Sequence, residues 1–238
     1  MKIKAEKLIN HIEKARVGGL VNEVVLDENL SFCVTDDAKS VLAISNLGLG
    51  ESGFEKIGIF DLGLFVKAIQ FASTQIFSAD EDLNFTVEEN YLVFKKGKSE
   101  FKFLLSSPEA IGSTVQNVDD IFKRVQASSS IDIKIKKEDF DVVSKSIELI
   151  VPERVTMYVE EGKVCVLVGI TTQHNAVVCI GETKSKSEFK IQFHPAVFVK
   201  LIQVLPFNEE ITMELRKDTP VVFSSEYYTF VIAPMKEQ

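Results

Sequence analysis

Two short segments of the chain carry the same order of basic and amide side chains. Residues 65–70 read FVKAIQ and residues 198–203 read FVKLIQ. At helical spacing, Lys67 and Gln70 share a polar face in the first segment, and Lys200 and Gln203 share the same face in the second. Such side chains contact phosphate oxygens without reading base sequence. The residues alone favour the simpler interpretation of an ordinary solvated helix face.

No group of residues has the spacing of a catalytic or metal site. The three histidines are scattered, with no spacing typical of zinc ligands. The Gly-rich run at 48–53 lacks the Lys-Ser/Thr pair of a phosphate-binding loop. Asp36 and Asp37 fall in a predicted turn, where solvated carboxylates are common. We therefore expect no enzymatic activity, no bound metal and no cofactor.

The cysteines predict no redox chemistry either. Cys33, Cys165 and Cys179 are widely spaced, odd in number, and each lies in an apolar strand-like run. This pattern predicts buried, reduced thiols and neither a disulfide framework nor a metal site.

Composition and charge set the protein class. The 238 residues are 45% hydrophobic and 26% charged, which is typical of a globular chain long enough for two domains. The N-terminus is amphipathic and no apolar run reaches membrane-spanning length, so we expect a soluble intracellular protein without a membrane partner. The net charge of −8 is spread over both halves. Any basic surface must therefore be one face that both halves share.

The polar faces of segments 65–70 and 198–203 must be positioned by helices, and these helices belong to a repeated unit. In the first half we expect an opening helix closed by Gly18-Gly19, then a β-meander, a strand, a helix capped by Asp61, and a second group of strands. The predicted helices cover about 6–17 and the segment containing 65–70; the predicted strands are 21–26, 30–35, 40–46, 56–60, 84–87, 91–94 and 100–105.

The second half repeats this order at a separation of 133 positions. Its predicted helices are 138–150 and a second one with Pro195 in its first turn; its predicted strands are 131–135, 155–159, 163–170, 176–181, 189–193, 211–215, 221–224 and 227–232. The sequence thus predicts an α+β fold with two tandem β-α-βββ-α-βββ domains. We place them at 1–107 and 131–238, joined by a Ser/Asn-containing connector at 108–130.

Two tandem domains of this kind resemble the DNA sliding clamps, the family of proliferating cell nuclear antigen and its phage counterparts. The closing run 227–235, YYTFVIAPM, is similar to the family ending Tyr-Tyr-Leu-Ala-Pro-Lys. The run 61–73 also resembles the family, and Lys67 lies at a position that is basic in the eukaryotic clamp. Residues 133–147 and 158–169 are similar to the T-even-phage clamp, which the chain resembles most.

The resemblance implies a ring with sheets outside and helices lining the hole. Three subunits would join head to tail, with the strand at 100–105 of one subunit beside the strand at 176–181 of the next. The ring would encircle duplex DNA without sequence specificity, act as a processivity factor in DNA replication, and tether DNA polymerase and other DNA-processing proteins. It would need an ATP-dependent clamp loader to open. The resemblance places it in the bacterial host cytoplasm if phage-encoded, or in the nucleus if eukaryotic.

The resemblance also implies two sets of site residues. Those facing DNA would be Lys7, Asn10, Lys14, Arg16, Lys67, Gln70, Lys145, Lys200 and Gln203. Those forming a groove for a partner's hydrophobic peptide would be Thr35, Lys39, Val118, Ile121, Phe122, Ile232, Ala233, Pro234 and Met235. A connector packed on its own core is the simpler alternative for the groove.

The third helix departs from the family pattern. It carries Glu138, Asp139, Asp141 and Glu148, and Val142 stands where the eukaryotic clamp is basic. We therefore expect a weakly positive lining and a loose grip, which a closed ring tolerates because encirclement keeps it on DNA.

Two other functions remain open from the residues alone. One is a monomeric DNA-binding processivity factor of the same fold, which would hold DNA by direct charge and which the net charge of −8 disfavours. The other is a β-rich enzyme or interaction protein, made by duplication, that is not a clamp.

Overall fold

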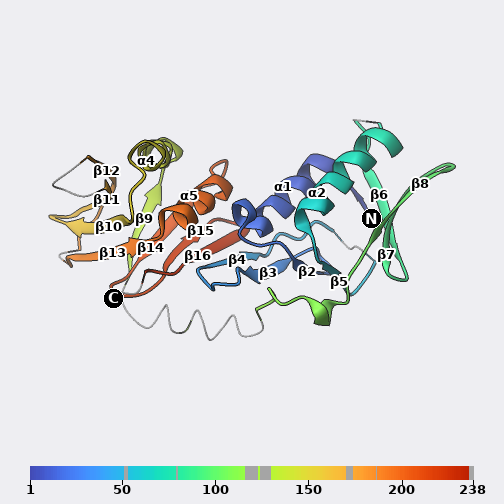
Figure 1. Cartoon of the computed structure of the whole chain (residues 1–238), viewed down its shortest axis with the longest axis horizontal. Helices are drawn as coiled ribbons and strands as arrows, with labels where there is room; N and C mark the ends of the chain where they lie inside the picture. Colours follow the sequence, from blue (N-terminus) through green and yellow to red (C-terminus); the bar gives the residue numbers. More distant parts are fainter. Residues whose placement is uncertain are drawn as a thin grey trace. The chain divides into compact units, whose positions relative to one another are not determined.

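The computed structural model describes residues 1–50, 53–78, 80–115, 123, 130–169, 174–185 and 187–235. Its elements are drawn in Figure 1. The chain divides into two compact units. Unit 1 is Met1–Asp37 with Ala43–Gln116, and unit 2 is Ala38–Leu42 with Asn117–Gln238. The limits 1–107, 108–130 and 131–238 stay a prediction, since most of the connector lies outside the described residues.

Two helices pack against each other in unit 1 (Figure 1). Helix α1 (Ala5–Arg16) buries Leu8 and Ile12. It ends where Val17 adopts a left-handed conformation with φ of 45°, and two glycines with positive φ continue the turn. Helix α2 (Leu62–Phe71) begins at the predicted cap, where the Asp61 side chain accepts a hydrogen bond of 2.7 Å from the Leu64 N–H.

The strands of unit 1 form antiparallel groups. The strands β1 (Lys2–Ile3), β6 (Leu83–Glu88), β7 (Tyr91–Lys96) and β8 (Ser99–Leu104) form one sheet in the order β1-β6-β7-β8. The strand β2 (Val24–Asp27) pairs with β5 (Lys56–Ile59), and β3 (Phe32–Thr35) neighbours β4 (Val41–Ser45). Among the described strands, the outer strand β8 pairs only with β7.

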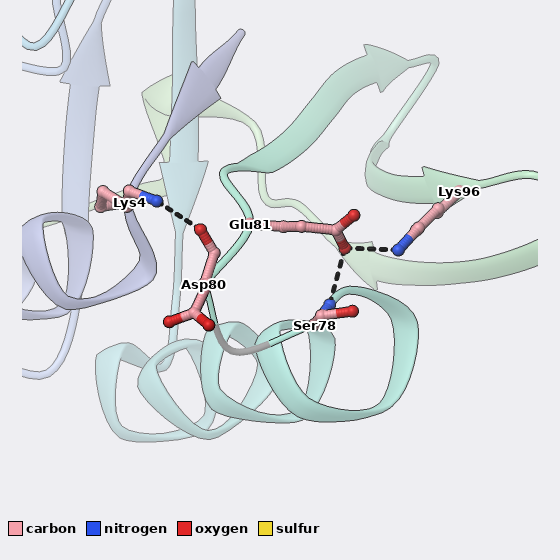
Figure 2. A network of polar contacts seen from close by, with 5 residues as sticks. All are labelled: Lys4, Ser78, Asp80, Glu81 and Lys96. Carbon is pink, nitrogen blue, oxygen red and sulfur yellow. Dashed lines mark hydrogen bonds and ion pairs between the residues drawn. The ribbon is translucent and has the colours of Figure 1, made fainter.

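A polar network fixes the segment that follows α2 and its π-helical extension η2 (Ala72–Ile76) (Figure 2). The Glu81 carboxylate accepts a hydrogen bond of 2.8 Å from the Ser78 N–H and forms an ion pair with Lys96. Lys4 donates to the Asp80 carbonyl at 2.5 Å and forms an ion pair with Asp82 at 3.3 Å. The hydrogen bond from Lys96 lowers the pKa of Glu81. Both lysines are therefore paired with carboxylates.

Unit 2 has the same kinds of elements. Its helices are α4 (Lys137–Ile150) and α5 (Pro195–Val204). Its strands are β9 (Ile131–Ile135), β10 (Val155–Glu160), β11 (Lys163–Gly169), β12 (Asn175–Glu182), β13 (Phe189–Phe193), β14 (Ile211–Leu215), β15 (Val221–Ser224) and β16 (Tyr228–Ile232). One sheet has the order β12-β11-β10-β13, and β16, β15, β14 and β9 pair in succession. The core contains the stacked rings of Phe193 and Phe198, 5.4 Å apart.

The predicted α+β fold class is confirmed, and the predicted elements differ from the observed ones mainly at their ends. The strand predicted at 21–26 begins only at Val24, because Leu20 and Val21 still donate hydrogen bonds back to the end of α1. The sequence prediction gave no range for the short strand β1. The prediction of three buried thiols was wrong for Cys179, which is exposed on the outer strand β12. No helix among the described residues has both the length and the apolar character to cross a membrane.

Candidate nucleic-acid interface

The exposed face of α1 carries the first group of predicted DNA contacts. Lys7 and Asn10 are exposed and Lys14 is half-buried, on the side of the helix away from its buried apolar residues. Arg16 differs from them: it is half-buried and pairs with Glu13 at 2.7 Å. Its charge is therefore already balanced within the helix, so it is a weaker candidate for phosphate contact.

The exposed face of α2 carries Lys67 and Gln70, opposite the buried Phe65, Ala68 and Ile69. The helix packs beside α1, so these two polar faces belong to one helical layer of unit 1 (Figure 1). Lys67 also lines a hollow of about 350 Å³ next to β8. This lysine is thus close to the edge of the sheet as well as to the helical face.

In unit 2 the predicted contacts are Lys145 on α4 and Lys200 and Gln203 on α5. Lys145 and Gln203 are exposed and Lys200 is half-buried. Gln203 lines a hollow of about 560 Å³ that Lys137 and Asn208 also line. Sequence reasoning missed these last two, although Lys137 opens α4 on the same side as Asp141, one turn later.

The acidic residues expected to weaken this interface are exposed on α4. Glu138, Asp141 and Glu148 are exposed and Asp139 is half-buried. Val142 is exposed as well. Asp141, Lys145 and Glu148 follow one another at helical spacing on one face. The exposed face of α4 therefore mixes both signs of charge, as that of α1 does with Glu6 and Lys7.

His11 is built into the core of unit 1 and is no candidate for catalysis. It is 1% exposed, its Nε2 lies 2.7 Å from the Leu30 carbonyl oxygen, and its ring packs on Phe32. Burial lowers its pKa to about 4. Among the described residues, no three His, Cys, Asp or Glu side chains gather as a metal site would require.

The C-terminal part of the predicted peptide groove is ordered against its own unit. Ile232 is buried at the end of β16, and the Ala233 N–H donates to the Ser40 carbonyl at 2.9 Å. The Met235 N–H donates to the Gln192 carbonyl at 2.7 Å, and Met235 is exposed. Pro234 between them is half-buried. The segment is therefore held by its backbone while some of its apolar surface faces outward.

The other predicted groove residues divide into two groups. Lys39 is exposed with φ of 52°, and Thr35 is half-buried in β3, where its N–H donates to the Ser113 carbonyl at 3.0 Å. The connector residues Val118, Ile121 and Phe122 lie outside the described residues.

Glu23 anchors the start of the connector. The sequence analysis did not predict this role for Glu23. Its carboxylate accepts hydrogen bonds from the N–H groups of Gly112 at 2.7 Å and Ser113 at 2.9 Å. The Ser113 hydroxyl donates back to the Glu23 carbonyl at 2.8 Å. These contacts hold Thr114 in an antiparallel bridge with Val34 of β3. No local pattern could reveal a contact between residues so far apart in the sequence.

Exposed apolar side chains of the described residues gather beside two outer strands, β8 and β12. Beside β8, the exposed Phe60, Leu64, Phe71 and Leu104 line the 350 Å³ hollow. Beside β12, Leu149 is 85% exposed, Val177 is exposed, and a second hollow of about 510 Å³ lies between α4 and the start of β12. Apolar surface gathered in this way marks an interaction site more often than scattered apolar residues do.

No known family model matches the chain, and no curated protein matches it in sequence. Solved structures do match its fold. Entamoeba histolytica proliferating cell nuclear antigen has a TM-score of 0.72 at 13% identity, covering 99% of this chain and 98% of that one. A. fulgidus PCNA, solved with the C-terminal region of FEN-1, has a TM-score of 0.71 at 18% identity, covering 100% of both. The PCNA2-PCNA3 complex from Sulfolobus tokodaii has a TM-score of 0.67 at 15% identity, covering 100% of this chain and 100% of that one. The chain therefore has the fold of the DNA sliding clamps.

Proposed function

We propose that the chain is a DNA sliding clamp: a homotrimeric ring that encircles duplex DNA, tethers a polymerase and other DNA-processing proteins, and has no enzymatic activity. The observation that carries this proposal is the pair of outer strands, β8 and β12, each flanked by exposed apolar side chains. The likeness of fold over the whole chain supports it. A likeness to phage clamps in particular rests only on the sequence resemblance of residues 133–147 and 158–169.

The two edges favour a head-to-tail joint. In the described residues no strand pairs with the outer side of β8 or β12, so both present unpaired backbone groups. Joining β8 of one subunit to β12 of the next would pair these groups and cover the exposed Leu104 and Leu149. Because the two surfaces differ, repeated joining leads either to a closed ring or to an open filament. The sliding clamp implies closure with three copies.

The helices would face the DNA. Lys7, Asn10, Lys67, Gln70 and Lys145 are exposed on helical faces and can contact phosphates without reading bases. Gln203 would complete the set on α5, with Lys14, Arg16 and Lys200 contributing less because they are half-buried. With a net charge of −8, such contacts give a weak grip. Retention would come from encirclement, and an ATP-dependent loader would open the ring.

The C-terminal segment would receive a hydrophobic peptide from a partner. A. fulgidus PCNA was solved with the C-terminal region of FEN-1, a protein segment bound to a clamp of the same fold. In this chain the exposed Met235 and half-buried Pro234 offer apolar surface on a fixed backbone. Ala233, Thr35, Lys39 and the connector residues would form the remainder of that groove, with Ile232 as its buried floor.

Native mass spectrometry tests the assembly. A ring of three copies has three times the subunit mass of 26.6 kDa. A stable species at 26.6 kDa would favour the monomeric processivity factor instead.

Retention on DNA tests encirclement separately. Protein assembled on nicked circular DNA by a clamp loader should co-elute with the circle and be released when a restriction enzyme linearises it. Equal retention on circular and linear DNA would show that direct binding, and not a closed ring, holds the protein.

A further inference from the structure

Two cysteines face each other across neighbouring strands. Cys165 of β11 and Cys179 of β12 are direct partners in the antiparallel register. Directly opposed residues have Cα atoms roughly 4.5–5.5 Å apart and side chains on the same face of the sheet. A disulfide requires a Cα separation of about 4.4–6.8 Å. The register therefore places the two Cα atoms at a separation that a disulfide can span.

The two thiols differ in access to solvent. Cys165 is 3% exposed and lies between Cys179 and Tyr158, its register partner on β10. Cys179 is exposed on the outer strand of the sheet. A dissolved reagent therefore reaches Cys179 first. Cys165 is then placed to react with a mixed disulfide formed on Cys179.

The hydrogen-bond ladder is irregular next to this pair. Val164 pairs with Gly181, whereas Cys165 pairs with Cys179, so Ile180 is an extra residue on β12. Such a bulge interrupts the ladder locally. Small adjustments of the Cys179 backbone therefore cost less here than in a regular strand, which helps the sulfur reach the dihedral angle of a disulfide.

We propose that Cys165 and Cys179 are a thiol modification site that forms a reversible cross-strand disulfide by exchange with a small disulfide such as oxidised glutathione. The Cys179 thiolate attacks one sulfur of the reagent, whose S–S bond breaks and releases one glutathione thiolate, which takes up a proton. The Cys165 thiolate then attacks the Cys179 sulfur, and the second glutathione leaves in the same way. The two protein thiols are oxidised, and one glutathione disulfide is reduced to two thiols. The site does not depend on the proposed ring.

The second step sets the pH dependence. Burial raises the pKa of Cys165 to about 11, and the neighbouring Cys179 adds to the effect. Only the thiolate attacks. The rate of closure should therefore rise about tenfold per pH unit between pH 7 and pH 9, because the thiolate fraction rises in that proportion well below the pKa. The mixed disulfide on Cys179 should accumulate at the lower pH.

Intact-mass spectrometry of the full chain under non-reducing conditions tests the site. With excess oxidised glutathione we expect a transient adduct of one glutathione, then a species lighter than the reduced chain by two hydrogen atoms, and full reversal by dithiothreitol. Peptide mapping should link Cys165 to Cys179. This measurement uses the wild-type chain, so it tests the disulfide even if a cysteine variant fails to fold.

Variants at each cysteine provide the controls. Cys165→Ser should stop at the glutathione adduct, and Cys179→Ser should give neither adduct nor disulfide over the same time. Cys33→Ser should behave as the wild type, because Cys33 lies in unit 1 and burial raises its pKa to about 12. A wild-type adduct that never closes, or a disulfide joining two chains through Cys179, would overturn the proposal.

Discussion

At the scale of single residues, the structure separates groups that hold the fold from groups free to contact other molecules. His11 and Lys7 lie one turn apart on α1, yet His11 is enclosed by the core while Lys7 is exposed. Arg16 is balanced by Glu13. Residue type alone therefore does not decide which polar side chains can take part in binding.

His11 should make the protein less stable in mild acid. Its pKa is lowered to about 4 by burial, whereas the unfolded chain has the ordinary value near 6.5. Between these values the unfolded state binds more protons, so the free energy of unfolding rises with pH and falls as pH drops from 6.5 towards 4. The loss should approach about 3 kcal/mol near pH 4. Urea unfolding of the wild type and of His11→Gln across this range measures the difference in slope.

If His11→Gln keeps the wild-type slope of unfolding free energy against pH, His11 is not the group that titrates.

At the scale of elements, each helix buries one face and leaves a different charge pattern on the other. On α4, Lys145 lies between Asp141 and Glu148 on one exposed face, so its charge is opposed by two carboxylates. On α1, the exposed Lys7 and Asn10 share the solvent side of the helix with the exposed Glu6. Glu23 links two segments of unit 1. Its carboxylate accepts hydrogen bonds from the backbone at 112–113, which fixes the start of the connector.

Reversing one charge on α4 should strengthen binding to DNA. Glu148→Lys places a second lysine beside Lys145 on the face proposed to line the hole. Equilibrium binding to a short duplex should become tighter, and the slope of log K against log salt should steepen by about one unit. Fluorescence anisotropy over a range of salt concentrations measures both quantities.

Glu160→Lys makes the same change of charge at an exposed residue that ends strand β10 and belongs to no helix. It should leave the salt slope near that of the wild type. Equal effects of the two variants would mean that net charge, and not the face of α4, governs binding.

At the scale of the whole molecule, the described strands include two different apolar edges, and the protein has a negative net charge. These features fit the proposed closed ring around DNA better than a monomer held on DNA by charge attraction. An exposed edge is a liability in a monomer, because it can pair with any other strand. Among the described strands, β8 and β12 are two such edges, and each lies beside exposed apolar side chains. A head-to-tail assembly uses both.

Mixing two edge variants tests the direction of the joint. Leu104→Asp disrupts the β8 edge and Val177→Asp disrupts the β12 edge, so neither variant alone should form a trimer. Mixed together, they retain one intact joint, between β8 of the Val177 variant and β12 of the Leu104 variant. Native mass spectrometry should therefore show a heterodimer of twice 26.6 kDa and no trimer.

Tyr227→Asp, at an exposed residue on neither edge strand, should leave the assembly of the wild type unchanged. A homodimer of either edge variant would point to a two-fold contact and contradict the head-to-tail joint.

Features that depend on neighbours a few positions away could be read from the sequence. The buried stripe of α1, the Asp61 cap of α2 and most strands follow from periodicity and local hydrogen bonding. The α+β class could be predicted because the same pattern occurs twice. The exposure of Lys7, Lys67 and Lys145 on their helices could be predicted from helical periodicity, whereas their contact with DNA stays a prediction.

The contacts between segments distant in the sequence became visible in the folded chain. The fold places Glu23 at the start of the connector, leaves β8 and β12 at sheet edges, and encloses His11. It also set the register that opposes Cys165 and Cys179, which the widely spaced cysteines of the sequence did not suggest. These features arise from strand pairing and packing between distant segments, whose partners are selected by the fold as a whole and not by local pattern.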